Sequence, residues 1–184
     1  MEKDFIDQLK TIPLTRRQYA QLSLEREYIH WRIARYHVQK KRRQCLRLQD
    51  PLLNVVSNYD LSRLEFGSLQ FDAKVTTDDD YFKVGRFDDG LLCISRHDES
   101  VRIVRDIYRP ESDYNRDYYC ACCGAAFLQA LIPAAIFMER CFIDDMLVST
   151  EQMYDGMVYY CGGIAGGESF EFFNMLLQGP DRSW

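Results

Sequence analysis

Three cysteines lie close together in the chain, and their spacing could serve a metal or a redox reaction. Cys120 and Cys123 form a C-x-x-C pair, with Cys122 between them. A structural zinc site needs four ligands, usually two such pairs, but the downstream Cys141 and Cys161 each stand alone. A redox pair is expected at a helix start in a βαβ context, which this sequence lacks. We therefore expect packed thiols and no metal, and keep a small enzyme or metal protein centred on this cluster as a third hypothesis.

Other patterns that could support catalysis are weak. The glycine-rich run GGIAGGE (162–168) lacks the lysine and hydroxyl residue of a phosphate loop, and Glu168 would repel a phosphate. His30 and His37 are seven residues apart, whereas a metal pair on a helix needs a spacing of three or four. No catalytic triad can be recognised. The sequence therefore predicts a protein that is not an enzyme, with no catalytic residues and no cofactor.

Basic residues gather in one part of the chain. Residues 14–50 carry ten Lys and Arg against three Asp and Glu, whereas residues 51–184 carry eleven against twenty-two. The run KKRRQCLR (40–47) could neutralise several phosphates. A nucleic-acid-binding or regulatory protein that uses residues 32–47 is therefore the alternative function. Because the remaining chain would repel a polyanion, we expect the basic segment to lie along the acidic part of its own domain.

A long N-terminal helix is expected to carry this basic segment. A short amphipathic helix over 3–12 ends at Pro13, and Thr15 with Gln18 forms a capping box for the next helix. Apolar residues spaced by three and four follow to Tyr36, so this helix can run to about Leu48. Its aromatic stripe could pair with a second copy, which makes a homodimer possible.

Short runs rich in Val, Ile, Tyr and Phe follow from residue 52, and turn residues separate them. They predict strands over 52–57, 63–71, 81–87, 91–97 and 100–108. The last three form a meander over 81–108, because Asp88-Asp89-Gly90 is a strong hairpin signal and Asp98-Glu99 a weaker one. The acidic residues of these turns are Asp78, Asp79, Asp80, Asp88, Asp89, Asp98 and Glu99.

Helices dominate the C-terminal part of the expected fold. A strand at YYCACC leads into an apolar helix from Gly124, with a kink or break at Pro133. A strand-like run over 157–163 and a helix from Ser169 complete the chain. We predict an α+β fold in one domain, 1–184, with a mostly antiparallel sheet flanked by helices. The helical N-terminal segment spans 1–50, the core 52–148 and a strand–helix extension 150–184.

The cellular compartment follows from the same composition. The chain has no run of eighteen apolar residues, which predicts no membrane-spanning helix, and its start does not have the form of a secretory signal. Seven cysteines, an odd number, argue against a disulfide framework. We therefore expect a cytoplasmic protein with reduced thiols and no membrane partner.

The region from Tyr81 to about Leu131 resembles the central part of the SUKH superfamily. The matching features are Val84-Gly85, the acidic turn Asp88-Asp89-Gly90, the strand LLCIS, the V-x-x-V strand Val101–Val104, and Phe127-Leu128 with Leu131; residues 59–64 resemble the segment before them. The glycine- and proline-containing N-terminal signature of commoner members is absent, and residues 150–184 have no counterpart.

This resemblance implies an α+β domain and a function in interbacterial competition. Many bacterial members are immunity proteins, each of which binds and blocks a cognate toxin without catalysis. Toxins that act on polyanions have basic active sites, and an acidic surface accelerates association with them. The seven acidic turn residues named above are thus the candidate partner-binding site, with solvated turns as the alternative. Nucleic acid is the less favoured partner.

Overall fold

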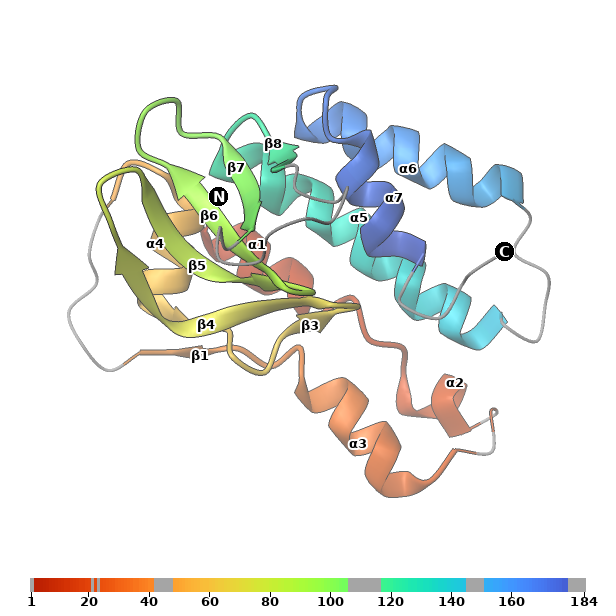
Figure 1. Cartoon of the computed structure of the whole chain (residues 1–184). Coiled ribbons are helices and arrows are strands. Elements are labelled where there is room, and N and C mark those ends of the chain that lie inside the picture. The colour runs from red at the N-terminus through yellow and green to blue at the C-terminus, as the bar shows by residue number, and fades with distance from the viewer. Residues whose placement is uncertain are drawn as a thin grey trace.

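A computed structural model describes residues 2–20, 22, 24–41, 48–105, 117–144 and 151–178 (Figure 1). Its helices are α1 (Glu2–Leu9), α2 (Arg16–Ala20), α3 (Arg26–Ala34), α4 (Pro51–Asn58), α5 (Gly124–Asp144), α6 (Glu151–Ala165) and α7 (Phe170–Gln178). Its strands are β1 (Gln39–Lys40), β2 (Tyr59–Asp60), β3 (Glu65–Phe66), β4 (Leu69–Thr77), β5 (Tyr81–Phe87), β6 (Gly90–Ser95), β7 (Val101–Arg105) and β8 (Tyr118–Ala121).

The main sheet is a continuous antiparallel arrangement in the order β3-β4-β5-β6-β7-β8. The predicted meander is confirmed in β5, β6 and β7, and its end at residues 106–108 lies outside the described residues. Asp88 and Asp89 connect β5 to β6 as a two-residue loop, with Asp88 at a positive φ of 50°. Aspartate tolerates this conformation better than most residues do, which is why the hairpin signal is reliable.

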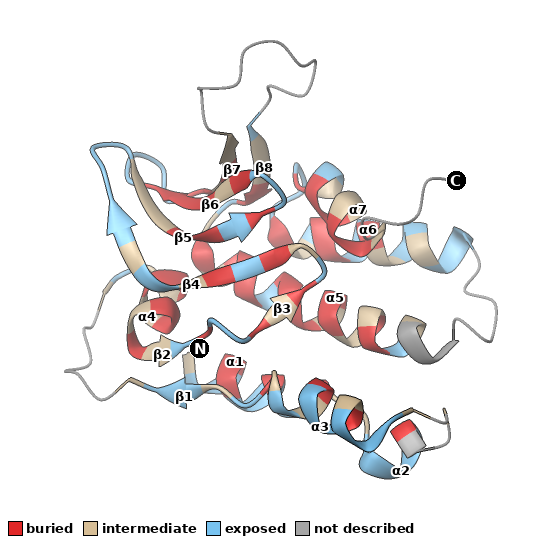
Figure 2. Ribbon diagram, turned by 60° about the horizontal axis from the view of Figure 1, so that its bottom comes forward, coloured by how far each residue is buried: buried red, intermediate tan, exposed pale blue. Residues whose placement is uncertain are grey.

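Helices flank this sheet, as the predicted α+β class requires. Helix α4 packs on β4 and β5, α5–α7 pack near β8, and α1 lies against α4 and α5. Figure 2 shows buried residues on the strands of the sheet and on the helices that pack against it. One apolar cluster contains side chains from α1, α4, the sheet and α5–α7, including Leu9, Leu52, Leu92, Phe127 and Phe172.

The predicted strand over 52–57 is wrong, because this segment forms α4. Asp50 is the N-cap residue, and its carboxylate accepts a hydrogen bond from the backbone N–H of Leu53 at 2.8 Å. Pro51 occupies the first helical turn, where its missing N–H costs nothing. The cap and the proline decide the structure here, although the valines and leucines favour a strand.

The predicted long N-terminal helix is also wrong. The capping box of Thr15 and Gln18 forms as expected, with reciprocal hydrogen bonds of 3.0 and 3.3 Å. However, α2 ends at Ala20, Glu25 is extended before α3, and the chain then enters β1. β1 pairs with β2, which follows α4, so the chain turns back toward the core instead of continuing as a helix.

Two further predictions about helices meet the structure differently. Helix α5 continues through Pro133, so a break there is wrong; the backbone carbonyl that proline leaves unpaired belongs to Gln129, an exposed residue. The strand expected over 157–163 is wrong as well, because these residues lie inside α6, where Val158, Cys161 and Ala165 are buried at helical spacing. The helix expected near Ser169 is confirmed as α7, which buries Phe172, Phe173, Leu176 and Leu177.

Helix α5 is long and apolar enough to cross a membrane by length and composition alone. Of its most apolar window, Gly124–Cys141, 61% is buried inside the protein. Helices α1, α4 and α6 all pack against it. It is therefore the central core helix of a soluble α+β fold.

One aspartate joins the starts of α4 and α5. Besides Leu53, the carboxylate of Asp50 accepts a hydrogen bond of 3.0 Å from the backbone N–H of Gly124. A methyl group at Gly124 would overlap the Asp50 carboxylate and lie 2.6 Å from the Cβ of Leu52. Glycine is thus required by space, not by backbone conformation.

We predict that Gly124→Ala destabilises the fold by about 1–3 kcal/mol, because the added methyl group must displace this shared cap. Gly163→Ala in α6 is the matched control: its methyl group would meet nothing within 4 Å. The control should gain about 0.5–1 kcal/mol from helix propensity. Urea unfolding of both variants measures the difference; equal stabilities would contradict the prediction.

Candidate functional site

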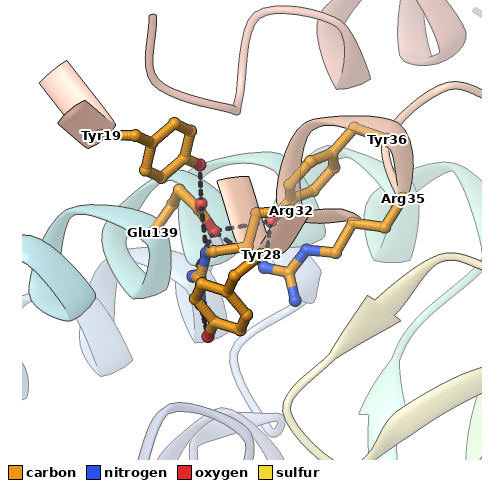
Figure 3. A network of polar contacts seen from close by, with 6 residues as sticks. All are labelled: Tyr19, Tyr28, Arg32, Arg35, Tyr36 and Glu139. Atoms are coloured by element: carbon orange, nitrogen blue, oxygen red, sulfur yellow. Dashed lines mark hydrogen bonds and ion pairs between the residues drawn. The ribbon is translucent and has the colours of Figure 1, made fainter. Parts of the chain in front are cut away.

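A buried carboxylate on α5 is the most heavily coordinated polar group among the described residues. The side chain of Glu139 is 1% exposed and accepts hydrogen bonds through both oxygens. Oε1 accepts hydrogen bonds from the Tyr19 hydroxyl and from Arg32 Nε, and the Arg32 Nε–Oε1 distance is 3.0 Å. Oε2 accepts from Arg32, Arg35 and Tyr36 at 2.9, 2.8 and 3.1 Å (Figure 3). We call these five residues the Glu139 cluster.

The cluster brings together residues that are far apart in the sequence. Glu139 projects from α5, Tyr19 comes from α2, and Arg32 comes from α3, with Arg35 and Tyr36 directly after it. In Figure 3 Tyr19 approaches Glu139 from one side, and Arg32, Arg35 and Tyr36 approach from the other. The separate helices α2 and α3 allow this approach from two sides, which one straight helix could not provide.

The ionisation of these groups follows from their surroundings. Burial alone raises the pKa of Glu139, but hydrogen bonds from Arg32 and Tyr19 and the charges of Arg32 and Arg35 outweigh burial and hold it below its ordinary value. Burial, together with the neighbouring carboxylate, raises the pKa of Tyr19 to about 12. The cluster is thus a carboxylate held by two guanidinium groups and two neutral tyrosines.

A cleft opens beside the Glu139 cluster. Its volume is about 250 Å³, and Arg32, Arg35 and Tyr36 form its polar wall. Its apolar wall comes from β3 and from α5, α6 and α7, through Phe66, Phe137, Met138, Tyr154, Leu176 and Leu177. A mostly apolar cleft with a few converging polar groups is the usual form of a small-molecule site.

The seven predicted partner-binding residues do not form one patch. Asp78–Asp80 lie between β4 and β5, and Asp98–Glu99 lie between β6 and β7, so these two turns share one end of the sheet. Asp88 and Asp89 lie between β5 and β6, at the opposite end. All seven residues are exposed, but a single small partner site cannot contact both ends at once.

Basic side chains already neutralise part of this acidity. Lys83 pairs with Asp78 at 2.9 Å, and its hydrogen bond, with that from the backbone of Tyr81, holds the pKa of Asp78 below its ordinary value. His97 contacts Asp80 at 2.9 Å, and Arg105 lies 3.8 Å from Asp89. These are exposed pairs, which contribute little to stability but reduce the negative potential.

Among the seven acidic turn residues, Asp98 accepts hydrogen bonds through both of its side-chain oxygens. The Ser100 hydroxyl donates a hydrogen bond of 2.6 Å to its Oδ1, and this bond, with those from Ser95 and the Ser100 backbone, holds its pKa far below the ordinary range. Arg102 donates to its other oxygen at 2.8 Å. Asp98 therefore shapes its turn, whereas Asp79, Asp88 and Glu99 make no hydrogen bond or ion pair through their side chains to any described residue.

A second acidic surface, which the sequence reasoning did not identify, lies on α6 and α7. Residues 151–178 contain Glu151, Asp155, Glu168 and Glu171 and not one Lys, Arg or His. Large apolar side chains of α6 are exposed as well: Met153 by 59%, Tyr159 by 67% and Tyr160 by 59%. A methyl group added at Gly156 or at Gly163 of this helix would meet nothing within 4 Å. We call the exposed residues Glu151, Met153, Asp155, Gly156, Tyr159, Tyr160 and Gly163 the α6 face.

The two acidic surfaces lie near each other. The backbone N–H of Cys122 donates to the carbonyl of Ala165 at 2.8 Å, and Ala121 pairs with Val101, so the end of α6 lies near the β6–β7 turn. Figure 1 shows the α6–α7 turn beside β8 at the top of the view, on the side of the β6–β7 turn. Asp79, Glu99 and Glu168 together define what we call the acidic edge.

The cysteine cluster lies at the junction of β8 and α5. Cys120 is fully buried, and burial raises its pKa well above the ordinary value. Cys122 is exposed, with its sulfur 4.0 Å from that of Cys123; slight burial and then the neighbouring thiol raise the pKa of Cys122 as well. A raised pKa does not favour a nucleophilic role for Cys120 or Cys122. Within the described ranges, no group of three or more His, Cys, Asp or Glu is placed to hold a metal ion.

The structure describes residues 32–41 and not residues 42–47 of the basic segment. Arg32 and Arg35 belong to the Glu139 cluster, and the ammonium group of Lys41 donates to the carbonyls of Val56 and Ala73 at 2.7 and 2.8 Å. Residues 42–47, with most of the basic run, lie outside the described residues. Arg32 and Arg35 pair with a carboxylate of the acidic part of the chain, but this carboxylate is the buried Glu139 of α5 and not a residue of the acidic turns.

Comparison of the chain with protein-family models, with curated proteins and with solved structures finds no match in any of the three. The SUKH resemblance therefore stays a prediction. The functional description of this protein depends on its geometry alone.

Sequence reasoning missed Glu139, although one signal marks it. It is the first charged residue after fifteen uncharged residues of α5, and Arg140 and Asp144 follow it. A carboxylate that is buried with an apolar helix must find donors elsewhere in the fold, since burying an unpaired charge is costly. The sequence does not indicate which residues supply them.

We predict that Glu139→Gln lowers the free energy of unfolding by about 3–5 kcal/mol, because two buried guanidinium groups lose their counter-charge. The same carboxylate makes stability depend on pH. Its folded-state pKa lies below the ordinary value of 4.5, so its contribution is complete above that value and is lost as the pH falls through the folded-state pKa.

Urea unfolding from neutral pH to about pH 4 measures both effects. Glu171→Gln on the exposed surface of α7 is the control, expected to change stability by less than about 0.5 kcal/mol. An unchanged stability in Glu139→Gln would show that the cluster does not hold the N-terminal segment.

Proposed function

We propose that the protein is a non-catalytic binding protein that occludes a basic partner protein. The partner is a toxin delivered between bacterial cells, as the SUKH resemblance implies. The observation that carries this proposal is the combination of uncommitted carboxylates on the acidic edge with exposed aromatic side chains on the α6 face. Charge accelerates encounter with a basic surface, and tyrosine supplies rigid contact area at an interface.

The composition of the α6 face supports a protein partner of opposite charge. Exposed Tyr and Met are typical of the central part of a protein interface. Gly156 and Gly163 each destabilise α6 by about 1 kcal/mol relative to alanine, although an alanine methyl group would meet nothing within 4 Å. Glycine at these positions would let a partner protein approach the helix backbone closely. Because α6 and α7 carry carboxylates and no cation, two copies of this face would repel each other, which disfavours a homodimer through it.

The observations do not favour nucleic acid as the partner. Three cations of the basic segment, Arg32, Arg35 and Lys41, are engaged with groups of the protein itself. The exposed carboxylates of both sheet ends and of α6 would repel a phosphate backbone. A toxin that enters the cell and meets its inhibitor there requires a cytoplasmic location for this protein, which is part of the proposal.

The proposal predicts a gene for a secreted toxin beside the gene for this protein, and the product of that gene is the partner used for biolayer interferometry at low and high salt. We predict that the double variant Asp79→Asn and Glu99→Gln lowers the association rate constant several-fold at low salt, with a smaller effect at high salt. The matched control is Asp88→Asn with Asp89→Asn at the other end of the sheet. Failure of the proteins to associate, or equal effects of both variants, would contradict the proposal.

The α6 face makes a separate prediction for the dissociation rate. Tyr160→Ser removes a 59% exposed ring and should leave the free energy of unfolding nearly unchanged. It should accelerate dissociation of the complex about tenfold or more, as expected for a central aromatic contact. Glu171→Gln on α7 is the control, with little effect on dissociation. An unchanged dissociation rate in Tyr160→Ser would exclude α6 from the interface.

A further inference from the structure

From the cleft beside the Glu139 cluster we infer a binding site for a small apolar monocarboxylate. The anionic group binds Arg35, and the apolar part lies between α5 and α7. This inference is independent of the proposed function, since the cleft is lined by other residues than the acidic edge and the α6 face.

The charge and hydrogen bonding of Arg35 point to an anion. Of its three guanidinium nitrogens, Nη2 alone has hydrogen-bond partners in the described part of the chain, namely Tyr36 and Glu139. Its Nε is buried and has no partner there. Nη1, which is not buried and has no hydrogen-bond partner in the described part of the chain, is the donor that an acceptor in the cleft would pair.

Glu139 cannot supply this missing acceptor. Its two oxygens already accept five hydrogen bonds, from both tyrosines and both arginines of the cluster. Two guanidinium charges face this one carboxylate, so the cluster carries one excess positive charge. A ligand carboxylate is the complementary group, since guanidinium and carboxylate form strong charge-assisted hydrogen bonds.

The apolar walls of the cleft indicate the size and polarity of the rest of the ligand. Phe137, Leu176 and Leu177 are nearly buried, and Met138 adds a flexible apolar surface that adapts to shape. The volume of about 250 Å³ lies just below the range for drug-sized ligands, so the ligand is small. Glu65 of β3 also lines the cleft and would repel a second negative charge. The class is therefore a monocarboxylate with an aromatic or medium-length aliphatic tail.

Isothermal titration calorimetry of the full chain with 3-phenylpropionate and n-octanoate tests this inference. Binding should saturate at one equivalent for at least one of the two acids. The neutral 3-phenylpropanol should bind at least tenfold more weakly, because it lacks the charge that Arg35 recognises. Octanedioate should also bind more weakly than n-octanoate, owing to Glu65.

Two variants locate the site. Arg35→Met should weaken binding of the acids tenfold or more, whereas Arg86→Met on the exposed face of the sheet should leave it unchanged. Met138→Trp fills the cleft without removing a polar contact and should abolish binding, so the test stands even if Arg35→Met does not fold. Absence of saturable binding of both acids, equal binding of the alcohol, or binding that persists in Met138→Trp would overturn the inference.

Discussion

The need to pair one buried carboxylate, Glu139, decides how the N-terminal third of the chain is arranged. An unpaired charge at this depth in α5 would be prohibitively costly, so donors must be brought to it from outside the helix. They come from α2 and from the end of α3, which lie 103 to 120 residues away in the sequence. The helices that carry them must therefore bend around the carboxylate. That bend replaces the continuous helix which the local sequence pattern favours.

The same requirement creates the cleft. Their common carboxylate holds Arg32 and Arg35 against one part of α5, while α7 packs against α5 elsewhere. The cleft lies between them, with the arginines on one wall and apolar side chains on the other. In many proteins a buried ion pair contributes little net stability and is retained for specificity of structure. Here the cluster fixes the position of α3, and the cleft exists only while α3 remains in that position.

The sequence predicts those features that depend on neighbouring residues. The capping box at Thr15, the loop at Asp88-Asp89 and the strands β5–β7 involve residues within a few positions of one another, so local patterns determine them. Asp50 shows the limit of such reasoning: its role as cap of α4 is local and can be read beside Pro51, but its hydrogen bond to Gly124 joins residues 74 positions apart. The candidate site has the same limit. The exposure of the seven acidic turn residues was predictable, and their division between two ends of the sheet follows from the alternation of turns in an antiparallel meander; the surface on α6 and its place near these turns depend on packing between distant segments.

Charge distribution links the N-terminal segment to the acidic surface. The +7 segment and the −11 remainder suggest mutual neutralisation across the domain, and the structure shows it at one buried carboxylate and not along the acidic turns. Arg32 and Arg35 use a carboxylate inside the core, and the cations of the sheet pair with acids of their own turns. The α6–α7 hairpin has no such cations, so its carboxylates keep their full potential toward solvent. A ligand in the cleft would stabilise the docked position of α3 by mass action, whereas a partner on α6 and the acidic edge would contact elements that α3 does not hold. Tyr154 of α6 and Leu176 of α7 line the cleft, so the helices that carry the α6 face also form part of the cleft wall and connect the two binding events.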